Sequence, residues 1–449
     1  MDFIKHQNMN KRVVITGLGV VAPNGVGLDA FTHAIKNGIS GIKHDAELER
    51  LQFSCQIAGK PAISTALALQ YFSELELRNF NSSGILYGVI AGIDAWIDAG
   101  LSMEIKEEPD WVSGTIFGTG TSGIDKFRES IYKIDDFQTR RLGSTAVGQT
   151  MNSGVSAYLG GKLGLGNQVS TNSSACTTGT ESILMGYERI KSGQAKRILA
   201  GSTSDSGPYI WGGFDAMKVC TFKHNENPEQ GSRPMSASAS GFVPGSGAGA
   251  LLLEDLETAM SRGAKIYAEV LGGNINSGGQ RGLGTMTAPN PIAVQKCIID
   301  AIANAGITAA EIDAINGHLT ATAKDSLEIK NWSEALGRKG NEFPYINSLK
   351  SMVGHCLSAA GSIESVASVL QLHLGFVFPN INCADLHPEI TAIIDKSRIP
   401  QQLIKKELNI VAKASFGFGD VNGCVIFKKF IAHEHPFLSG NAAHRKINT

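Results

Sequence analysis

The sequence predicts an α/β protein in which strands and helices alternate along the chain. Short runs of apolar, mostly β-branched residues, such as Val13, Val14 and Ile15, recur between longer segments whose apolar residues have helical spacing. Glycine accounts for 52 of the 449 residues and aromatic residues for only 7%, a balance typical of tight turns and close helix–sheet packing. This alternation favours a layered α/β fold.

The first series of elements lies in the N-terminal half. Short apolar runs that end near glycine or polar residues predict strands at 11–17, 112–118, 168–171 and 197–201. Apolar residues at helical spacing predict helices at 29–36, 82–99, 151–163 and from 177 to about 190.

A second series follows in the C-terminal half. Strands are expected at 249–253, 265–271, 312–316, 409–414 and 423–428. Helices are expected at 256–262, 291–305, 325–336 and 358–374. The two series are similar in length and order, which predicts a duplicated α/β unit. We expect two similar halves, residues 1–254 and 255–430, packed as one body, and a mobile tail at 431–449.

The bulk composition disfavours several classes of protein. The formal net charge of -1 gives no global reason to expect nucleic acid or a membrane surface as a partner. Seven cysteines are scattered singly, without a C-x-x-C pair, which is typical of reduced thiols in a cytosolic protein. No N-terminal signal peptide is recognisable, and no run approaches the roughly 18 apolar residues of a membrane-spanning helix. We therefore expect a cytoplasmic location.

One cysteine differs from the other six in its setting. Cys176 lies within residues 170–182, where small and hydroxyl residues lead from a strand end into the first turn of a helix. Unpaired backbone N–H groups and the positive end of the helix dipole favour thiolate over thiol there. Small neighbours leave room for a substrate to reach the sulfur. The pattern predicts that Cys176 is a nucleophile.

Two histidines accompany this cysteine in unusual settings. His318 comes just after a predicted strand, and His355 precedes the long apolar helix at 358–374, with Lys350 five residues before it. Glycine and hydroxyl residues flank both histidines, and ligands of α/β sheets collect at the carboxyl ends of strands. One cysteine with two histidines and a lysine could form a covalent acyl-transfer site.

Two other kinds of site are weighed against this one. A metal centre is not expected, because its ligands usually lie at short spacing, whereas Cys176, His318 and His355 are far apart in the sequence. A nucleotide-binding oxidoreductase is the second alternative, since residues 17–22 fit the pattern G-x-G-x-x-A after a strand. The segment 23–25, Pro-Asn-Gly, interrupts the helix that this fingerprint needs, which disfavours it.

The chain resembles the β-ketoacyl-acyl carrier protein synthases, the elongating condensing enzymes of the thiolase superfamily. The resemblance runs from Lys11 to about Lys429 and depends on four motifs: Ser-Ala-Cys-Thr-Thr-Gly at 174–179, Asn-Gly-His at 316–318, Lys-Ser-Met-Val-Gly-His at 350–355, and Ser-Phe-Gly-Phe-Gly at 415–419. It implies a thiolase-like five-layer αβαβα fold made of two similar halves. It also implies a homodimer, with a heterodimer of related ketosynthases as the alternative, and acyl carrier protein as the partner.

The resemblance further implies the reaction and the residues that perform it. Cys176 would hold the growing acyl chain as a thioester, and His318 and His355 would stabilise the enolate formed when a malonyl thioester loses carbon dioxide. The backbone N–H groups of Cys176 and Phe418 would form an oxyanion hole, with Phe418 as a gate. Substrates would arrive on the phosphopantetheine of the carrier, so no cofactor and no metal are expected.

Further residues are assigned by the same resemblance. Lys350 would organise the site with Asp325 and Glu364. Substrate and pantetheine contacts are expected from Thr287, Thr320, Thr322, Thr121 and Phe416, with Thr121 in the acyl pocket. Arg140, Arg141 and Lys223 would form a docking patch for an acidic carrier.

The chain departs from the family pattern at several positions. Leu319 replaces a glycine after His318, and Asp420 and Val421 replace glycine and threonine after the Gly-Phe-Gly loop. Thr121 is smaller than the isoleucine common in the long-chain type. The product could therefore serve fatty-acid, polyketide or polyene synthesis. A non-catalytic chain-length factor remains the functional alternative, although such partners typically lose the nucleophilic cysteine that this chain retains.

Overall fold

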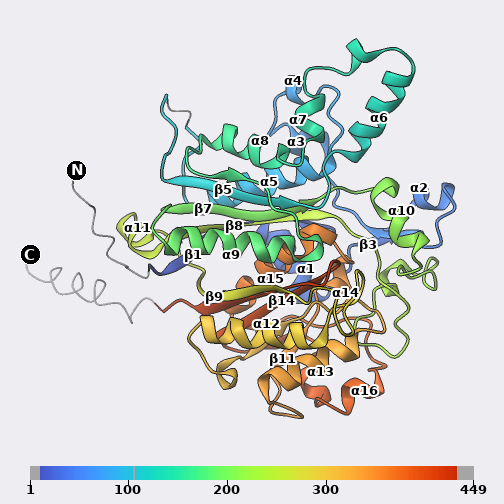
Figure 1. Cartoon of the computed structure of the whole chain (residues 1–449), viewed down its shortest axis with the longest axis vertical. Coiled ribbons are helices and arrows are strands. Elements are labelled where there is room, and N and C mark those ends of the chain that lie inside the picture. Colours follow the sequence, from blue (N-terminus) through green and yellow to red (C-terminus); the bar gives the residue numbers. More distant parts are fainter. Residues whose placement is uncertain (1–10, 105–106, 432–449) are drawn as a thin grey trace, which may run out of the picture.

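The computed structural model describes residues 11–104 and 107–431, arranged in five layers (Figure 1). Helices cover the top, a strand layer lies beneath them, a helical layer fills the middle, and a second strand layer and further helices lie below. This is the αβαβα arrangement that the resemblance implies. Of the tail expected at 431–449, residues 432–449 lie outside the described residues.

The N-terminal half supplies the upper two layers and one middle helix. Its strands are β1 (Val13–Ala22), β2 (Gly25–Val26), β3 (Ile42–His44), β4 (Ile57–Gly59), β5 (Ser113–Thr119), β6 (Val169–Ser170), β7 (Arg197–Ser204) and β8 (Gly247–Asp255). Its helices are α1 (Leu28–Asn37), α2 (Ala46–Arg50), α3 (Thr65–Ala68), α4 (Glu74–Leu77), α5 (Ser83–Asp98), α6 (Ile124–Asp135), α7 (Ala146–Thr150), α8 (Gly154–Leu163), α9 (Thr178–Lys191) and α10 (Pro208–Ala216).

The C-terminal half supplies the lower layers and the second middle helix. Its strands are β9 (Ala268–Ser277), β10 (Ala314–Asn316), β11 (Tyr345–Asn347), β12 (Phe376–Val377), β13 (Ile404–Lys405), β14 (Ile410–Gly417) and β15 (Val421–Lys429). Its helices, with α11 that joins the halves, are α11 (Leu256–Ser261), α12 (Pro291–Asn304), α13 (Asp325–Leu336), α14 (Lys350–Val353), α15 (Ala360–Leu374) and α16 (Pro388–Thr391). The predicted boundary at 254/255 falls at the end of β8 and stays a prediction.

The strand order repeats between the two halves. Neighbouring strands run β11-β10-β14-β15-β9 in one half and β6-β5-β7-β8-β1 in the other. In each half the first three strands are parallel and the last two pair antiparallel. The halves join where Val13, Val14 and Ile15 of β1 pair with β9. The duplicated unit inferred from element order is therefore present in the topology, although no repeat is visible in the sequence.

The packing of α5 on β1 excludes a nucleotide-binding loop at residues 17–22. Residues 17–22 lie inside β1, not in a loop. A Cβ atom on Gly17 would come within 2.0 Å of the Ala95 carbonyl oxygen, and one on Gly19 within 1.9 Å of that of Ala91. These glycines serve the close approach of a helix to a strand rather than of a backbone to a phosphate.

The two middle helices, α9 and α15, cross in direct backbone contact. A Cβ atom on Gly179 would lie 2.3 Å from the Ser362 nitrogen, and one on Gly361 would lie 2.6 Å from the Thr180 nitrogen. Each helix thus presents a glycine to the other at the crossing. The first turns of both helices are thereby held against each other at the centre of the molecule.

Most predicted elements are present with shifted ends, and some were missed. β9 extends to Ser277, beyond the predicted 271, because its polar second half pairs with β15 in the sheet and carries no apolar signal. The helix predicted at 151–163 begins three residues later, at Gly154. Helices α6 and α10 were not predicted. Among the described residues, no helix is both long and apolar enough to cross a bilayer.

Candidate active site

Cys176 occupies a tight turn at the start of α9. Ala175 adopts the left-handed conformation with φ of 50°, and the single 3-10 turn η2 (Ala175–Thr177) then leads into the helix. The Thr178 hydroxyl donates to the Ala175 carbonyl at 2.7 Å and accepts from the Ser174 N–H at 2.9 Å. Hydroxyl residues thus hold the turn, and the predicted position of Cys176 at a helix start is confirmed.

His318 follows β10 and is held by a carboxylate from α13. The backbone N–H groups of His318 and Leu319 donate to the two carboxylate oxygens of Glu328 at 2.6 and 2.7 Å. The left-handed residue of this loop is Ala321, with φ of 62°, rather than Leu319. Leu319 therefore needs no glycine-only conformation, and its side chain packs in the core.

His355 is anchored by its own ring as well as by its backbone. Its N–H donates to the Val243 carbonyl at 2.7 Å, and its carbonyl accepts from the Gly245 N–H at 2.9 Å. Its Nδ1 accepts a hydrogen bond from the Leu357 N–H at 3.1 Å. In a neutral imidazole the other nitrogen then carries the proton. His355 Nε2–H is therefore free to donate to a ligand.

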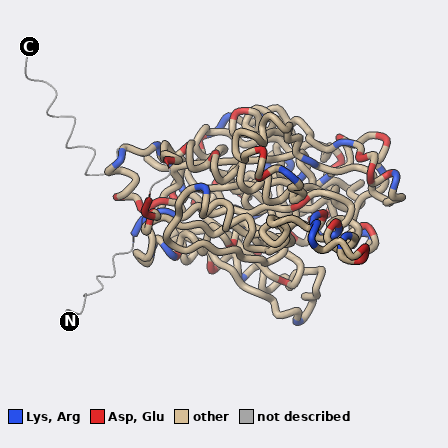
Figure 2. Tube along the Cα trace, turned by 90° about the horizontal axis from the view of Figure 1, so that it is seen from above, with Lys and Arg blue, Asp and Glu red and all other residues tan. Residues whose placement is uncertain are grey.

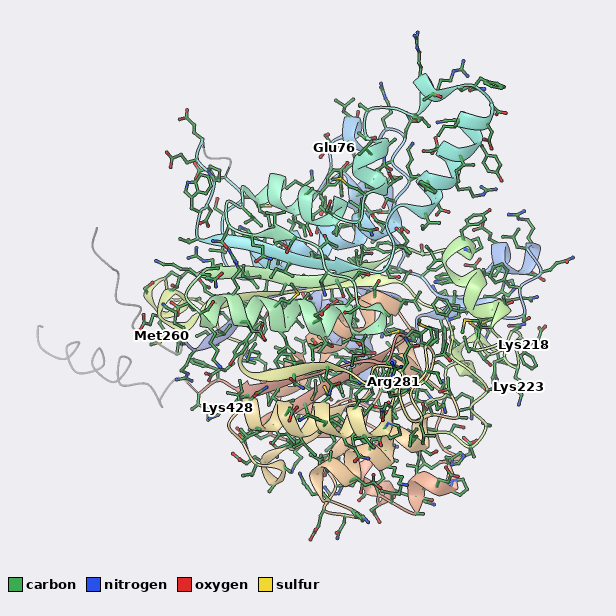
Figure 3. The ribbon with its side chains drawn as sticks, in the orientation of Figure 1. Glu76, Lys218, Lys223, Met260, Arg281 and Lys428 are labelled. Atoms are coloured by element: carbon green, nitrogen blue, oxygen red, sulfur yellow. The ribbon has the colours of Figure 1, made fainter. Side chains whose placement is uncertain are left out.

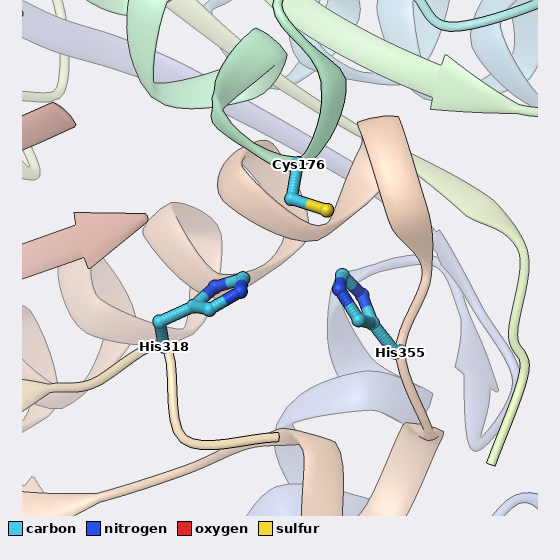
Figure 4. Close-up of side chains that lie close together, drawn as sticks. All are labelled: Cys176, His318 and His355. Carbon is cyan, nitrogen blue, oxygen red and sulfur yellow. The ribbon is translucent and has the colours of Figure 1, made fainter. Parts of the chain in front are cut away.

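The fold brings these three side chains together, as Figure 4 shows. One ligand-type atom each from Cys176, His318 and His355 lies within 4.8 Å of the other two. The two imidazole rings have centroids 5.3 Å apart and planes inclined by 82°. The sulfur comes from the N-terminal half and both rings come from the C-terminal half. The predicted constellation is thus assembled at the contact between the two halves.

Burial, rather than the helix start, governs the resting state of the thiol. Desolvation raises the pKa of Cys176 to about 11, and the positive charge of Lys350 and the backbone N–H of Phe418 only partly oppose this rise. Burial therefore opposes the preference for thiolate that the helix start favours. With its pKa raised, the Cys176 thiol needs a base to accept its proton as it attacks.

Both histidines are held neutral. Burial lowers the pKa of His318 and of His355 well below the usual value, and the positive charge of Lys350 lowers each further. A neutral imidazole can accept a proton at one nitrogen and donate a hydrogen bond from the other. The Nδ1 atom of His318 has no hydrogen-bond partner among the described residues, which leaves either tautomer open to that ring.

A buried ion-pair network lies beside this site. Lys350 contacts Oε1 of Glu364, and Lys413 lies 2.8 Å from Oε2 of the same carboxylate. The pairing of Lys350 with Glu364 agrees with the sequence prediction. Lys413 was missed, although a lysine in the apolar run of β14 is a signal that could have identified it.

Asp325 has a different role from the predicted one. Its carboxylate accepts hydrogen bonds from the N–H groups of Met235, Thr320 and Ala321, and so shapes the turn after His318. Desolvation raises the pKa of Asp325 to about 6 and that of Glu328 to about 7. Glu328, which holds His318 directly, was missed, even though it lies one helical turn after Asp325.

A cavity of about 450 Å³ opens onto the three reactive side chains. Among the predicted contact residues, its walls include Thr287, Thr320, Thr322, Phe416 and Phe418. Phe418 packs against Phe214, also in the wall, with ring centroids 5.9 Å apart. Phe214, Phe242 and Val219 were not predicted. The lining joins apolar side chains to a few convergent polar groups, as in small-molecule sites.

Part of the cavity wall, at residues 287–289, belongs to the entrance loop, residues 278–290 between β9 and α12. Asp420, at the turn between β14 and β15, is fully buried and has φ of 62°. Its carboxylate accepts from the Gln280 and Asn290 N–H groups at 3.0 and 2.8 Å. The Gly419 N–H donates to the Met286 carbonyl at 2.8 Å. The substitution of glycine by Asp420 thus ties the entrance loop to the turn that carries Phe418.

Other predicted residues lie apart from the cavity. Thr121 is exposed just after β5 and is not part of the cavity wall. Arg140 and Arg141 lie in the connection from α6 to α7, at the top in Figure 1, whereas Figure 3 shows Lys223 at the right. Lysine and arginine alternate with acidic residues along the tube in Figure 2.

The three reactive atoms also have the donor types and spacing of a metal site. Folding brings these residues together, so their separation in the sequence does not disfavour a metal here. The Leu357 N–H already occupies Nδ1 of His355, so a metal could approach that ring only at Nε2 after its proton is lost.

The comparisons with known proteins agree with this geometry. The chain matches the family description "Beta-ketoacyl synthase, N-terminal domain" over residues 10–259 and "Beta-ketoacyl synthase, C-terminal domain" over residues 267–384. It is 34% identical over 427 residues to 3-oxoacyl-[acyl-carrier-protein] synthase 2 of Vibrio harveyi, covering 93% of this chain and 99% of that protein. The corresponding synthase 1 of Escherichia coli is 32% identical, with 93% and 99% covered.

Solved structures give the same answer. The ketosynthase complex titled "AntDE:AntF (apo): type II PKS acyl-carrier protein in complex with its ketosynthase bound to the hexaketide" superimposes with a TM-score of 0.82 at 29% identity, covering 94% of this chain and 100% of that chain. A β-ketoacyl synthase from Burkholderia phymatum gives 0.83 at 27% identity, again with 94% and 100% covered. With its fold, its Cys-His-His cluster and both halves of its sequence in agreement, the chain belongs to the β-ketoacyl synthase family of condensing enzymes.

Proposed function

We propose that Cys176 carries an acyl group as a thioester while His318 and His355 stabilise the enolate of a malonyl unit delivered on acyl carrier protein. The observation that carries this proposal is the meeting of one thiol and two neutral imidazoles within 4.8 Å at a cavity of about 450 Å³. The reaction is a decarboxylative Claisen condensation. Both substrates come on phosphopantetheine, and no resident cofactor takes part in the steps.

In the first step the thiol of Cys176 attacks the thioester carbonyl of the incoming acyl group. Because the pKa of the thiol is raised to about 11, its proton must leave as the bond forms. His318, with no other partner at Nδ1 among the described residues, accepts that proton and passes it to the leaving pantetheine sulfur. The acyl group is then on Cys176 and the free carrier departs as a thiol.

In the second step the malonyl carbon–carbon bond breaks and carbon dioxide leaves. The electron pair moves onto the thioester oxygen as an enolate, which accepts hydrogen bonds from the two imidazoles, including Nε2–H of His355. The enolate carbon then attacks the acyl carbonyl on Cys176. Backbone N–H groups of Cys176 and Phe418 are directed at the sulfur and would hold the second oxyanion. The carbon–sulfur bond breaks and the released thiolate of Cys176 takes one proton from solvent.

The central test uses acyl-carrier and malonyl-carrier with wild-type protein and Cys176→Ala. We expect a mass increase by one acyl group at Cys176 and β-ketoacyl product from the wild type, and neither from the variant. A Cys176→Ala protein that still makes β-ketoacyl product would refute the proposal. A chain-length-factor role, the alternative, predicts no acylation of Cys176 in either protein.

We further propose that the chain works as a homodimer. In support, α6 displays Phe127, Ile131 and Ile134 on one face, and Phe137 just beyond it is 97% exposed. Apolar side chains gathered on a surface mark interaction sites. Sedimentation of the wild type should give twice the monomer mass of 47.5 kDa, and Ile131→Asp should lower it toward the monomer. Recovery of a stable monomer from the wild type would contradict this proposal.

A further inference from the structure

A second lysine is buried beneath the site, where the reaction described above assigns it no task. Lys413 in β14 is fully buried. Its ammonium group contacts Oε2 of Glu364, whereas Lys350 contacts Oε1 of the same carboxylate. Lys413 also donates to the Ser415 hydroxyl at 3.0 Å and to the Ala414 carbonyl. Buried lysines are rare because desolvation opposes their charge, so each needs a partner.

The charges in this cluster do not balance. Two lysines share one carboxylate, so the triad Lys350–Glu364–Lys413 has a net charge of +1 when all three groups are ionised. Each side chain is at most 2% exposed, so solvent screens this charge weakly. An unbalanced buried charge costs stability, and proteins keep such charges mostly at functional sites.

The duplicated half shows what this part of the fold needs for packing alone. In the ladder of β14 with β15, Lys413 pairs with Val425; at the same place in the ladder of β7 with β8, Ala200 pairs with Leu251. Glu364 lies in α15 where α9 has Ser182, whose hydroxyl donates to the Gly179 carbonyl at 2.9 Å. The equivalent crossing is thus packed without any charge. The fold does not require the ion pair of Lys413 and Glu364.

The position of the pair indicates where it acts. Glu364 lies in the first turn and a half of α15, the helix that follows His355, and β14 continues from Lys413 to Phe416 in the cavity wall. The charge of Lys413 contributes to the lowered pKa of both His318 and His355. The charges that act on the Cys176 thiol are instead those of Lys350 and Glu364.

We propose that Lys413 is a positioning residue for the decarboxylation step: paired with Glu364, it sets a net positive charge behind His318 and His355, which favours the enolate but gives no help to His318 as the base of the thiol step. The inference rests on the proposed roles of the two histidines. Lys413 touches no substrate; it acts through the carboxylate that it shares with Lys350.

The experiment separates the two half-reactions in Lys413→Met. We expect kcat for release of carbon dioxide from malonyl-carrier to fall about tenfold, equivalent to about 1.4 kcal/mol of transition-state stabilisation, with KM unchanged. The rate of Cys176 acylation should not fall, because loss of this cation makes His318 a stronger base for the thiol proton. Lys126→Met is the matched control, because Lys126 is equally buried but lies in α6 and pairs with Glu129.

Two further variants separate charge from packing. Ser415→Ala removes the link from Lys413 to the Thr180 hydroxyl, 2.9 Å from Ser415, without changing any charge, and should leave carbon dioxide release intact. The double variant Lys413→Met/Glu364→Gln keeps the net charge at +1, since it removes one cation and one anion. It should recover much of the decarboxylation rate lost in Lys413→Met, a non-additive result.

The outcomes are distinct. Equal losses in acylation and decarboxylation, or an unchanged decarboxylation rate, would overturn the role of Lys413. If Lys413→Met does not fold, the double variant decides: decarboxylation near wild type supports the charge argument, and a tenfold loss refutes it. The proposed function fails separately, if His318→Ala still releases carbon dioxide at the wild-type rate.

Discussion

The turns that start α9 and α15 are built alike but carry different side chains. Ala175 and Leu357 both have φ of 50°, each opens a single 3-10 turn, η2 or η5 (Leu357–Ala359), and each turn runs into a middle helix. The second residue of the turn is Cys176 in one half and Ser358 in the other. The Ser358 hydroxyl donates to the Thr203 carbonyl at 2.7 Å, a structural hydrogen bond. The same backbone turn therefore holds the proposed nucleophile in one half and a structural hydroxyl in the other.

The difference comes from what surrounds each turn. The strands β14 and β15 are joined by the short turn 418–420, which places Phe418 against Cys176, whereas β7 and β8 are joined by the long excursion 205–246. The first turn faces the cavity and the two imidazoles, and the second is enclosed by protein. A helix start that carries a thiol is thus not enough to form the site. The partner half supplies the rest of the site.

The strongest test of the comparison exchanges the two residues. Cys176→Ser places in the first turn the residue that the second turn carries, and we expect the rate of condensation to fall by roughly a thousandfold or more, because a hydroxyl is a far weaker nucleophile than a thiol. Product analysis by mass spectrometry measures the loss. Ser358→Cys is the control and should keep condensation activity; a new acyl adduct at residue 358 would show that the two turns are chemically equivalent after all.

A second test concerns the residue two positions before each left-handed turn. This residue is His355 in the C-terminal half and Ser173 in the N-terminal half. His355→Ser should lower kcat for malonyl decarboxylation about a hundredfold, because it removes a donor aimed at the developing enolate. Ser173→Ala should change the rate little. A decarboxylation rate that survives His355→Ser would show that His318 alone stabilises the enolate.

The pH dependence of thiol reactivity gives a third test. Only the thiolate reacts with iodoacetamide, so alkylation of Cys176 should accelerate with rising pH up to about 11. Lys350→Met removes a nearby cation and should raise the pKa, which slows alkylation several-fold at pH 9. Peptide mapping distinguishes Cys176 from Cys55, whose pKa burial raises to about 12. A profile with a midpoint near 8 would contradict the dominance of burial.

A smaller effect is expected on folding stability. Burial raises the pKa of Glu328 to about 7, so folding takes up a proton at this carboxyl group. The stability that it contributes is present below about pH 4.5 and is lost as the pH rises through about 7, by at most about 1.4 kcal/mol per pH unit. Urea unfolding of Glu328→Gln should show a flatter pH dependence in this range. If the variant and the wild type show the same change of unfolding free energy with pH, other groups cause this pH dependence.

The smallest effect concerns the short turn itself. Asp420→Gly suits the left-handed backbone but removes the acceptor for the Gln280 and Asn290 N–H groups. We expect faster hydrogen exchange in the entrance loop and faster tryptic cleavage after Arg281, with less than about 2 kcal/mol lost in global stability. Unchanged hydrogen exchange at residues 280 and 290 would show that a glycine at position 420 holds this loop as well as Asp420 does.

Much of the fold and the core of the site could be predicted from the sequence. Periodicity identified α5, α12 and α13 to within a residue or so, because their buried faces repeat at helical spacing. The setting of Cys176 indicated a turn at a helix start. That it meets His318 and His355 followed from the family resemblance, since sequence alone does not show which strand ends lie side by side.

What failed to be predicted depends on long-range contacts. The resting state of Cys176 depends on burial by both halves, which a local dipole argument cannot weigh. Asp325 accepts from Met235, ninety residues away, so its role is invisible in the local motif. Helix α6 was missed although Phe127, Ile131 and Ile134 recur at helical spacing; these side chains are exposed rather than packed in a core. Thr121 was assigned by alignment to a motif, and its place outside the cavity wall appears only in three dimensions.

The glycine contact between α9 and α15 has a mechanical consequence. Gly179 and Gly361 allow the backbones of the two helices to touch. This contact fixes the spacing between the helix starts, and Cys176 and His355 lie just before them. A methyl group added at either glycine would push the two helix starts apart. It would thereby separate Cys176 from His355 without contacting either side chain.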